Sequence, residues 1–249
     1  MKRAGLVWTR PGPARQPLSR ARIVTTALAV ADAEGLAALS MRRIATELGA
    51  GAMSLYRHVQ DKEELLDLMA DEVYAEIALP APGSGAWDDN LRLIARQTRA
   101  AMRSHAWFAA VAVTRPPIGP NALAHLDSSL RALSGLGRPL VEVSRLLGTV
   151  TSFVTGLVAA ELAEEDARRR DGLSEQQWQE TFGPYIEEAM ASGRYPMLAQ
   201  LAGEDTDPRS PDEQFEFGLE CLIAGIAAKS ASARVSRERK AAEPGSAQG

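Results

Sequence analysis

Apolar residues recur at helical spacing along almost the whole chain, and no stretch shows the alternating pattern of a β-strand. Proline, glycine and charged clusters separate the apolar segments. The pattern therefore predicts an all-α protein. Its expected helices cover residues 19–35, 40–48, 52–59, 61–77, 86–103, 107–113, 120–136, 140–165, 174–192 and 212–231.

Residues 40–58 are the most informative stretch. Ser40 is a good N-cap, and Met41, Ile44 and Leu48 place one apolar stripe on the helix that follows. Gly49 stands where a helix end calls for a positive φ. The sequence thus predicts a first helix that ends in a sharp turn.

The next helix, from about residue 52, is barely two turns long and is anchored by Leu55 and Val59. Its free face carries apolar, hydroxyl, aromatic and basic side chains, which is what a helix-turn-helix presents to a DNA major groove. A plain pair of antiparallel helices has the same pattern, so these residues alone leave both interpretations open.

The flanking residues resemble the DNA-binding domain of the tetracycline-repressor family. The resemblance rests on Ala-x-Glu-Leu-Gly at 45–49, Leu-Tyr-x-His-Val at 55–59 and Lys-x-x-Leu-Leu at 62–66. It implies a three-helix DNA-binding domain over residues 18–79. The residues that it implies for DNA binding are Ser40, Arg42, Ala52, Met53, Ser54, Tyr56, Arg57, His58 and Lys62.

Charge is distributed unevenly along the chain. The residues up to Lys62 carry a balance of +6 and the rest −10, which gives the total of −4. Phosphate attraction is local because salt screens it beyond roughly 10 Å, so a basic segment on an acidic body fits a DNA-binding protein. A basic face that is only solvated is the alternative.

Composition indicates an ordinary globular protein, with 45% apolar and 24% charged residues. The single cysteine, Cys221, excludes an internal disulfide and favours a reducing, cytoplasmic compartment. Residues 1–17 are interpreted as a flexible basic arm without a signal-peptide core, and residues 231–249 as a disordered tail.

The segment 79–85 contains two prolines and two glycines and is expected to join the DNA-binding domain to a second domain over residues 80–230. Within it, the uncharged stretch 146–160 is too short and too polar for a membrane span, so no membrane partner is expected. The last helix is apolar over more than half its circumference. Either it is fully internal or it packs on a second copy, and the family resemblance favours a homodimer.

The second domain resembles, more loosely, the regulatory domain of the tetracycline repressor, which implies a small-molecule effector. Its aromatic and soft residues suggest a largely apolar site, although each is also ordinary core packing. The candidates are Met102, His105, Trp107, Phe108, Phe153 and Trp178. Ala78 and Val111 occupy the positions of the metal-binding histidines of the tetracycline binder. A magnesium-tetracycline effector is therefore not expected, nor any other metal or cofactor.

No short catalytic motif is present, so no catalytic residue is assigned and an enzyme is not expected. The resemblance favours a ligand-released transcriptional repressor that binds a palindromic operator as a homodimer. Two alternatives stay open. One is a DNA-binding protein without an effector, and the other is a helical small-molecule binder or enzyme that binds no operator.

Overall fold

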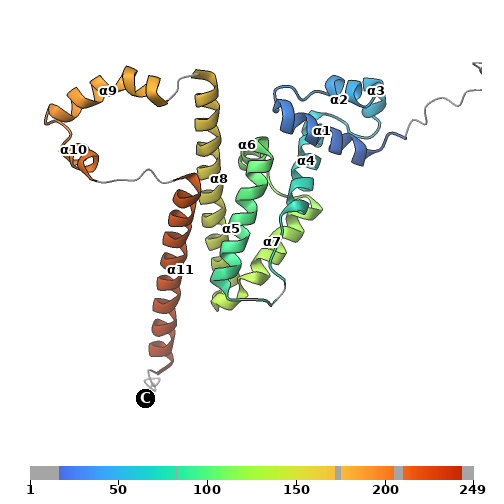
Figure 1. Cartoon of the computed structure of the whole chain (residues 1–249). Coiled ribbons are helices and arrows are strands. Elements are labelled where there is room, and N and C mark those ends of the chain that lie inside the picture. The colour runs from blue at the N-terminus through green and yellow to red at the C-terminus, as the bar shows by residue number, and fades with distance from the viewer. Residues whose placement is uncertain (1–16, 82, 172–174, 205–209, 243–249) are drawn as a thin grey trace, which may run out of the picture. The chain divides into compact units, whose positions relative to one another are not determined.

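The computed structural model describes residues 17–81, 83–171, 175–204 and 210–242. Throughout these ranges the regular elements are helices, and no residue in them is in a strand, which confirms the all-α prediction. The chain divides into two compact units between Glu72 and Val73 (Figure 1).

The first unit holds three short helices and most of a fourth. Their bounds are α1 Arg20–Glu34, α2 Met41–Glu47, α3 Ala52–Leu55 and α4 Lys62–Glu76. The side chains of Ile23, Ile44 and Leu65 are fully buried and form a small core. These four helices lie where the apolar spacing predicted them.

The turn between α2 and α3 has the expected chemistry. Ser40 caps α2 by accepting a hydrogen bond from the Arg43 amide at 3.1 Å, and Gly49 follows the helix at φ +61°. Leu55 and Val59 are completely buried and anchor the second helix. The α-helix itself ends at Leu55, earlier than predicted, and the chain continues as a turn.

The second unit is a bundle arranged around one long helix. The bounds are α5 Trp87–Ser104, α6 Ala106–Thr114, α7 Pro120–Ala132, the 3-10 helix η2 Ser134–Leu136, α8 Leu140–Asp171, α9 Glu175–Ala191, α10 Pro196–Gly203 and α11 Pro211–Ala242. The helices α5, α6, α7 and α11 all contact α8. Figure 1 shows α11 running beside α8 and α5.

The central helix α8 differs from the prediction in length. It covers 32 residues, and its segment Leu140–Arg170 is long and apolar enough to cross a membrane by length and composition. The uncharged stretch 146–160 therefore lies inside a much longer helix than was predicted. Val143, Val150 and Val158 are buried in the bundle, as in the core helix of a helical domain.

The C-terminal end of α8 was predicted to be a loop because residues 164–171 are densely charged. The helix instead continues to Asp171. Ion pairs one turn apart, Arg168 to Glu164 at 2.6 Å and Arg169 to Asp166 at 2.7 Å, support this turn. Arginines at a helix C-terminus also interact favourably with the helix dipole, which is negative at that end.

Other boundaries differ as well. The helix α10 was not predicted, although Pro196 stands at its first position, where proline is favoured. The helix α11 continues past residue 231, where a disordered tail was expected, to Ala242. The division into compact units falls inside α4, so that Tyr74 and Glu76 belong to the second unit, where they contact Phe108 and His105.

The contact between α8 and α11 depends on Gly218. A Cβ at this residue would stand 2.5 Å from Cζ of Phe153, whose ring stacks on Phe215 at 6.0 Å. We expect Gly218→Ala to lower the free energy of unfolding by about 1–3 kcal/mol, despite the better helix propensity of alanine. Thermal denaturation followed by circular dichroism measures this.

Gly148 on α8 is the matched control. A Cβ there meets no atom within 4 Å, so Gly148→Ala should raise the free energy of unfolding by about 0.5–1 kcal/mol. Equal stabilisation by both alanines would show that the Phe153 ring moves aside freely.

Candidate functional site

The exposed face of α2 and α3 carries most of the residues expected to bind DNA. The side chain of Met53 is 79% exposed and that of Tyr56 is 44% exposed, and Arg42 and Arg57 are exposed too. Ala52 and Ser54 are partly exposed beside them. The first unit therefore presents one surface with apolar, aromatic and basic groups.

The two arginines of α2 differ in their partners. Arg43 is held by Glu34 and Glu47, each at 2.7 Å. Arg42 is exposed, and within the described residues its guanidinium makes no ion pair or hydrogen bond. Arg42 is thus the guanidinium of α2 that can take an external partner.

Several polar groups on this surface are already engaged. The Ser54 hydroxyl donates to the carbonyl of Gly51, and Lys62 Nζ donates to the Leu36 carbonyl at 3.3 Å. The carbonyl of His58 accepts from Arg20 Nε at 3.2 Å. The α3 residues consequently offer mainly apolar contacts, and an ammonium such as Lys62 keeps further N–H donors.

The start of α4 is a reciprocal cap. Asp61 Oδ1 accepts from the Glu64 amide at 2.8 Å, and Glu64 Oε2 accepts from the Gln60 amide at 2.6 Å. This reciprocal pair of hydrogen bonds is a capping box. It fixes the direction in which α4 leaves the DNA-facing surface.

The second unit contains a cavity of about 370 Å³, within the usual size range for small-molecule sites. Its wall is mostly apolar, with several hydroxyl groups from α8, and it contains no Asp, Glu, Lys or Arg. The lining residues are Tyr74, Thr98, Met102, Phe108, Ala112, Pro117, Ala122, His125, Leu126, Ser144, Leu147, Gly148, Thr151, Ser152 and Thr155.

Aromatic rings gather at one end of the cavity. The ring of Tyr74 meets that of Phe108 edge-on, with 5.3 Å between centroids, and lies 5.5 Å from the ring of His125. Burial lowers the pKa of His125, so its imidazole is neutral at pH 7. The cavity therefore combines flat apolar surfaces with uncharged hydrogen-bonding groups.

Two of the six expected ligand residues, Met102 and Phe108, line this cavity. The other residues whose side chains are described have packing roles. His105 Nε2 lies 3.0 Å from Glu76, Trp107 is buried with its ring edge-on to Phe108, and Phe153 stacks on Phe215. The side chain of Trp178 is outside the described part of the chain.

Several of the lining residues that the sequence did not indicate are polar. Ser144, Thr151 and Thr155 recur along one face of α8, and the two threonines in the uncharged stretch 146–160 were a detectable signal. Tyr74 and His125 gave no comparable signal, because their place in the wall depends on how α4 and α7 pack. Selecting aromatic and methionine residues of the middle helices therefore does not identify these polar residues.

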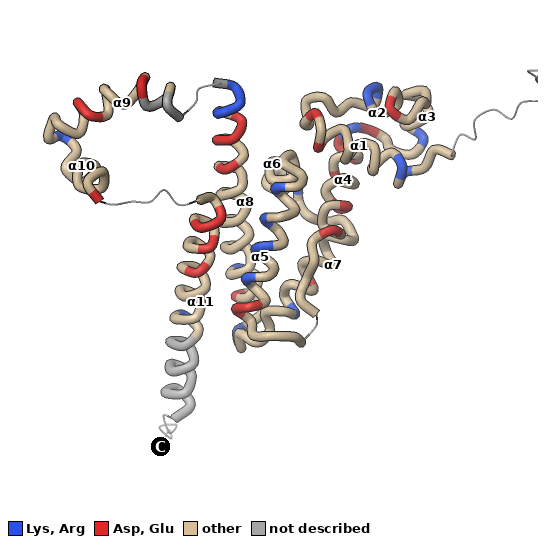
Figure 2. The backbone as a smooth tube through the Cα atoms, viewed as in Figure 1, with Lys and Arg blue, Asp and Glu red and all other residues tan. Residues whose placement is uncertain are grey.

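A row of arginines on α5 joins the cavity helices to α11, and these charges are visible in Figure 2. Arg92 pairs with Glu220 at 2.6 Å and Arg96 with Glu216 at 2.8 Å. These hydrogen bonds lower the pKa of Glu220 and Glu216. The row fixes α11 against α5.

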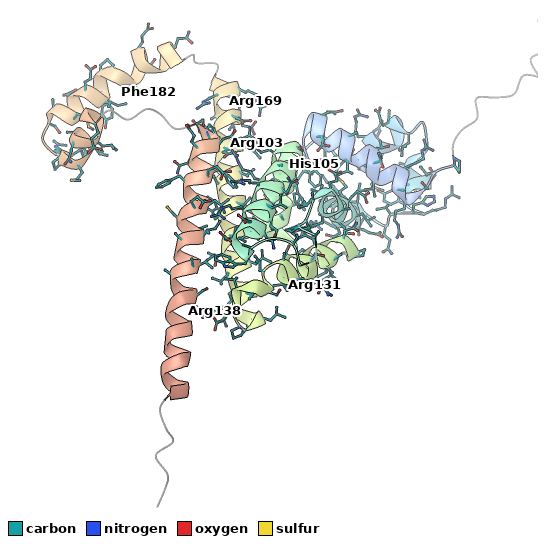
Figure 3. The ribbon with its side chains drawn as sticks, turned by 60° about the horizontal axis from the view of Figure 1, so that its bottom comes forward. Arg103, His105, Arg131, Arg138, Arg169 and Phe182 are labelled. Carbon is teal, nitrogen blue, oxygen red and sulfur yellow. The ribbon has the colours of Figure 1, made fainter. Side chains whose placement is uncertain are left out.

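Glu161 on α8 is the buried member of this network. Its carboxylate accepts from Arg99 and Arg103, both at 2.8 Å, although its side chain is only 8% exposed. Arg99 also pairs with Asp212 at 2.7 Å. Figure 3 labels Arg103, which lies on the α8 side of α5. Burial opposes the charge of Arg99, but the two carboxylates raise its pKa overall.

The described residues contain no group of three or more histidine, cysteine or carboxylate side chains that could hold a metal ion. The side chains of Ala78 and Val111, which the sequence resemblance aligns with metal-binding histidines, carry no ligand atoms.

Two family profiles match the chain. The one described as "Bacterial regulatory proteins, tetR family" matches residues 23–69, and "Tetracyclin repressor-like, C-terminal domain" matches residues 79–230. The repressor DrrR1 of Streptomyces coeruleorubidus is 40% identical over 227 residues, which cover 89% of this chain and 83% of the relative.

Solved structures agree with these matches. Apo ActR from Streptomyces coelicolor is 35% identical, with a TM-score of 0.74 over 88% of this chain and all of that one. The complex of ActR with actinorhodin is 35% identical, with a TM-score of 0.72 over 86% and 99%.

The chain therefore belongs to the tetracycline-repressor (TetR) family of DNA-binding transcriptional regulators. The predictions of this family and of a ligand-responsive transcriptional repressor are confirmed.

Proposed function

We propose that the protein represses transcription as a homodimer bound to a palindromic operator, and that a small molecule in the cavity of the second unit releases it. The observation that carries the proposal is that α4, which starts with a capping box beside the DNA-facing surface, also contributes Tyr74 to the cavity wall. Membership of the family supports this class of function. The roles of individual residues in DNA binding, dimerisation and effector binding are proposed below.

Arg42, Met53 and Tyr56 read the operator. An arginine bonds guanine O6 and N7 with two hydrogen bonds, which discriminates against other bases by about 1–3 kcal/mol. Met53 is exposed and apolar, so its partner in the major groove is a thymine methyl group. Ser40 and Arg57, both exposed, line the groove beside them.

His58 and Lys62 bind phosphates and thereby set the register of the protein on DNA. The amide groups at the start of α4 add to this anion site, because a helix N-terminus favours negative charge. Ala52 and Ser54 pack against the groove, since the Ser54 hydroxyl is engaged by Gly51.

The homodimer forms through α8 and α11. On α11, Phe215, Leu219 and Ile223 are buried in the subunit, whereas Cys221 and Ala224 are exposed on another face. On α8, the small residues Thr149, Ser152, Gly156 and Ala160 are exposed. Two such helices from each subunit can form a symmetric four-helix bundle.

The effector is a largely apolar, uncharged molecule. The structure of ActR, a similar protein, has been solved in complex with actinorhodin. The cavity of this chain has no charged side chain and an aromatic end, so it favours a flat organic molecule with hydrogen-bonding groups. A magnesium-tetracycline complex has no ligand for its metal at Ala78 or Val111.

Release is a shift between two conformations. The effector binds more tightly to the form that does not fit the operator, and such couplings are typically 1–3 kcal/mol. The buried side chains of Leu65 and Met69 on α4 transmit the change. The protein acts in the cytoplasm, where its DNA target lies.

The experiment that tests this function is a selection of random duplex DNA on the purified protein, repeated with Arg42→Ala and Tyr56→Ala combined. We expect the wild type to enrich a palindrome with half-site centres about 34–36 Å apart, or a multiple of that. The double variant should bind it at least about thirtyfold more weakly, because each contact is worth about 1–3 kcal/mol.

Loss of two solvent-exposed side chains should leave the melting temperature unchanged, so the comparison isolates DNA contact. Absence of any enriched sequence at low salt would contradict operator binding and favour the helical binder or enzyme. Enrichment of a single asymmetric site would contradict the homodimer alone.

A further inference from the structure

His125 on α7 is a partly buried polar side chain that lines the cavity. Its Nε2 is buried and has no hydrogen-bond partner among the described residues. Its nearest aromatic neighbour is Tyr74, with 5.5 Å between ring centroids. A covered polar group without a hydrogen bond destabilises the fold, so its presence calls for an explanation.

The charge state of this ring follows from its surroundings. The residues that line the cavity with it come from α4, α5, α6, α7, α8 and the loop before α7, and Tyr74 is the one other titratable group among them. No lysine, arginine, aspartate or glutamate faces the ring from this wall. A neutral imidazole has one N–H donor and one acceptor nitrogen, so it can both give and accept a hydrogen bond.

The same wall limits the charge of an occupant. An ionised group would enter the cavity without a charged partner, which is costly in a mostly apolar site. A hydroxyl group is matched by His125 and by the hydroxyls of Thr151 and Thr155. Aromatic rings of an occupant can pack against the rings of Phe108 and Tyr74, edge-on or face-on.

We propose that His125 is the hydrogen-bonding anchor of the effector, and that the effector is an uncharged polycyclic aromatic molecule that carries a hydroxyl group. This inference rests on the proposed function, because it assumes that the cavity is the effector site. It assigns a binding role to a residue that the sequence gave no reason to select.

Three pyrenes that differ in one substituent test the inference: 1-hydroxypyrene, pyrene and 1-pyrenecarboxylate. Their fluorescence reports binding to the full-length protein. We expect 1-hydroxypyrene to bind about five- to tenfold more tightly than pyrene, as one hydrogen bond allows, and the carboxylate to bind most weakly. In His125→Phe, which keeps a ring and removes both nitrogens, hydroxypyrene and pyrene should bind equally.

His125→Asn and His125→Gln are the rescue variants, because an amide group can occupy the place of one ring nitrogen or the other. At least one of them should restore the preference for hydroxypyrene. The melting temperature of each variant shows that it is folded, and a merely structural role of His125 would change binding of both neutral probes equally.

Gly148→Leu separates the two proposals. If this variant binds both neutral pyrenes as well as the wild type, the cavity is not the site and the effector part of the proposed function fails. If it loses both while His125→Phe keeps the preference for hydroxypyrene, the cavity is the site and the role of His125 is wrong. Tighter binding of the carboxylate than of pyrene, or no binding of either neutral probe to the wild type, would overturn the ligand class.

Discussion

Replacing Gly148 with leucine is expected to produce a repressor that still binds its operator and no longer responds to small molecules. Gly148 lines the cavity from α8, and a Cβ at this position has no atom within 4 Å. The added side chain therefore fills space that an occupant needs, without straining the helix. We expect binding of 1-hydroxypyrene to fall by about five- to 150-fold, since a steric overlap costs about 1–3 kcal/mol.

Stability should change in the opposite direction to binding. Leucine has a better helix propensity than glycine by nearly 1 kcal/mol, so the melting temperature should be equal or higher. Gly148→Ala is the matched control, because it has the same backbone gain with little added volume, and it should still bind the probe. A leucine variant that melts earlier and binds less would indicate a damaged fold and not a filled cavity.

The second large effect is expected at Glu161. Removing this carboxylate by Glu161→Ala leaves Arg99, whose side chain is 10% exposed, without its partner on α8, whereas Arg103 keeps Glu165 at 3.6 Å. Breaking a buried pair from one side typically costs about 3–5 kcal/mol. Because Arg99 keeps Asp212, we expect a loss near the lower value, about 3 kcal/mol, and a melting temperature lower by roughly 6–12 °C.

Asp127→Ala is the control for this measurement. The pair that Asp127 forms with Arg131 has the same 2.7–2.8 Å geometry, but both side chains are more than 60% exposed. Exposed pairs contribute about 0–1 kcal/mol, so the melting temperature should hardly move. Similar losses in the two variants would contradict the claim that burial makes Glu161 important.

Most of the fold could be predicted from the sequence because local rules decide it. The apolar stripe from Met41 to Leu48, the positive φ of Gly49 and the cap at Asp61 each follow from neighbouring residues. The errors came where two local signals compete. Residues 164–171 are charged enough for a loop, yet their charges are spaced to pair along a helix, as Arg168 and Glu164 do.

The cavity could be predicted only in part, because long-range packing decides which residues form its wall. Met102 and Phe108 were selected for their chemistry and do line it. Trp107 and Phe153 have the same chemistry and are used for packing instead. The sequence gives no reason to select His125, because a single histidine is more often exposed or satisfied, and only the packed structure shows that its Nε2 is buried without a partner.

The helix α4 has a consequence for building chimaeric regulators. It runs from Lys62 to Glu76 without glycine or proline, and the boundary between the compact units falls inside it, between Glu72 and Val73. A fusion made at the loop 79–85 would replace Tyr74 together with the native DNA-reading part, and so would change one wall of the cavity. A junction within α4 that keeps Val73 and the residues after it with the cavity would transfer operator choice alone.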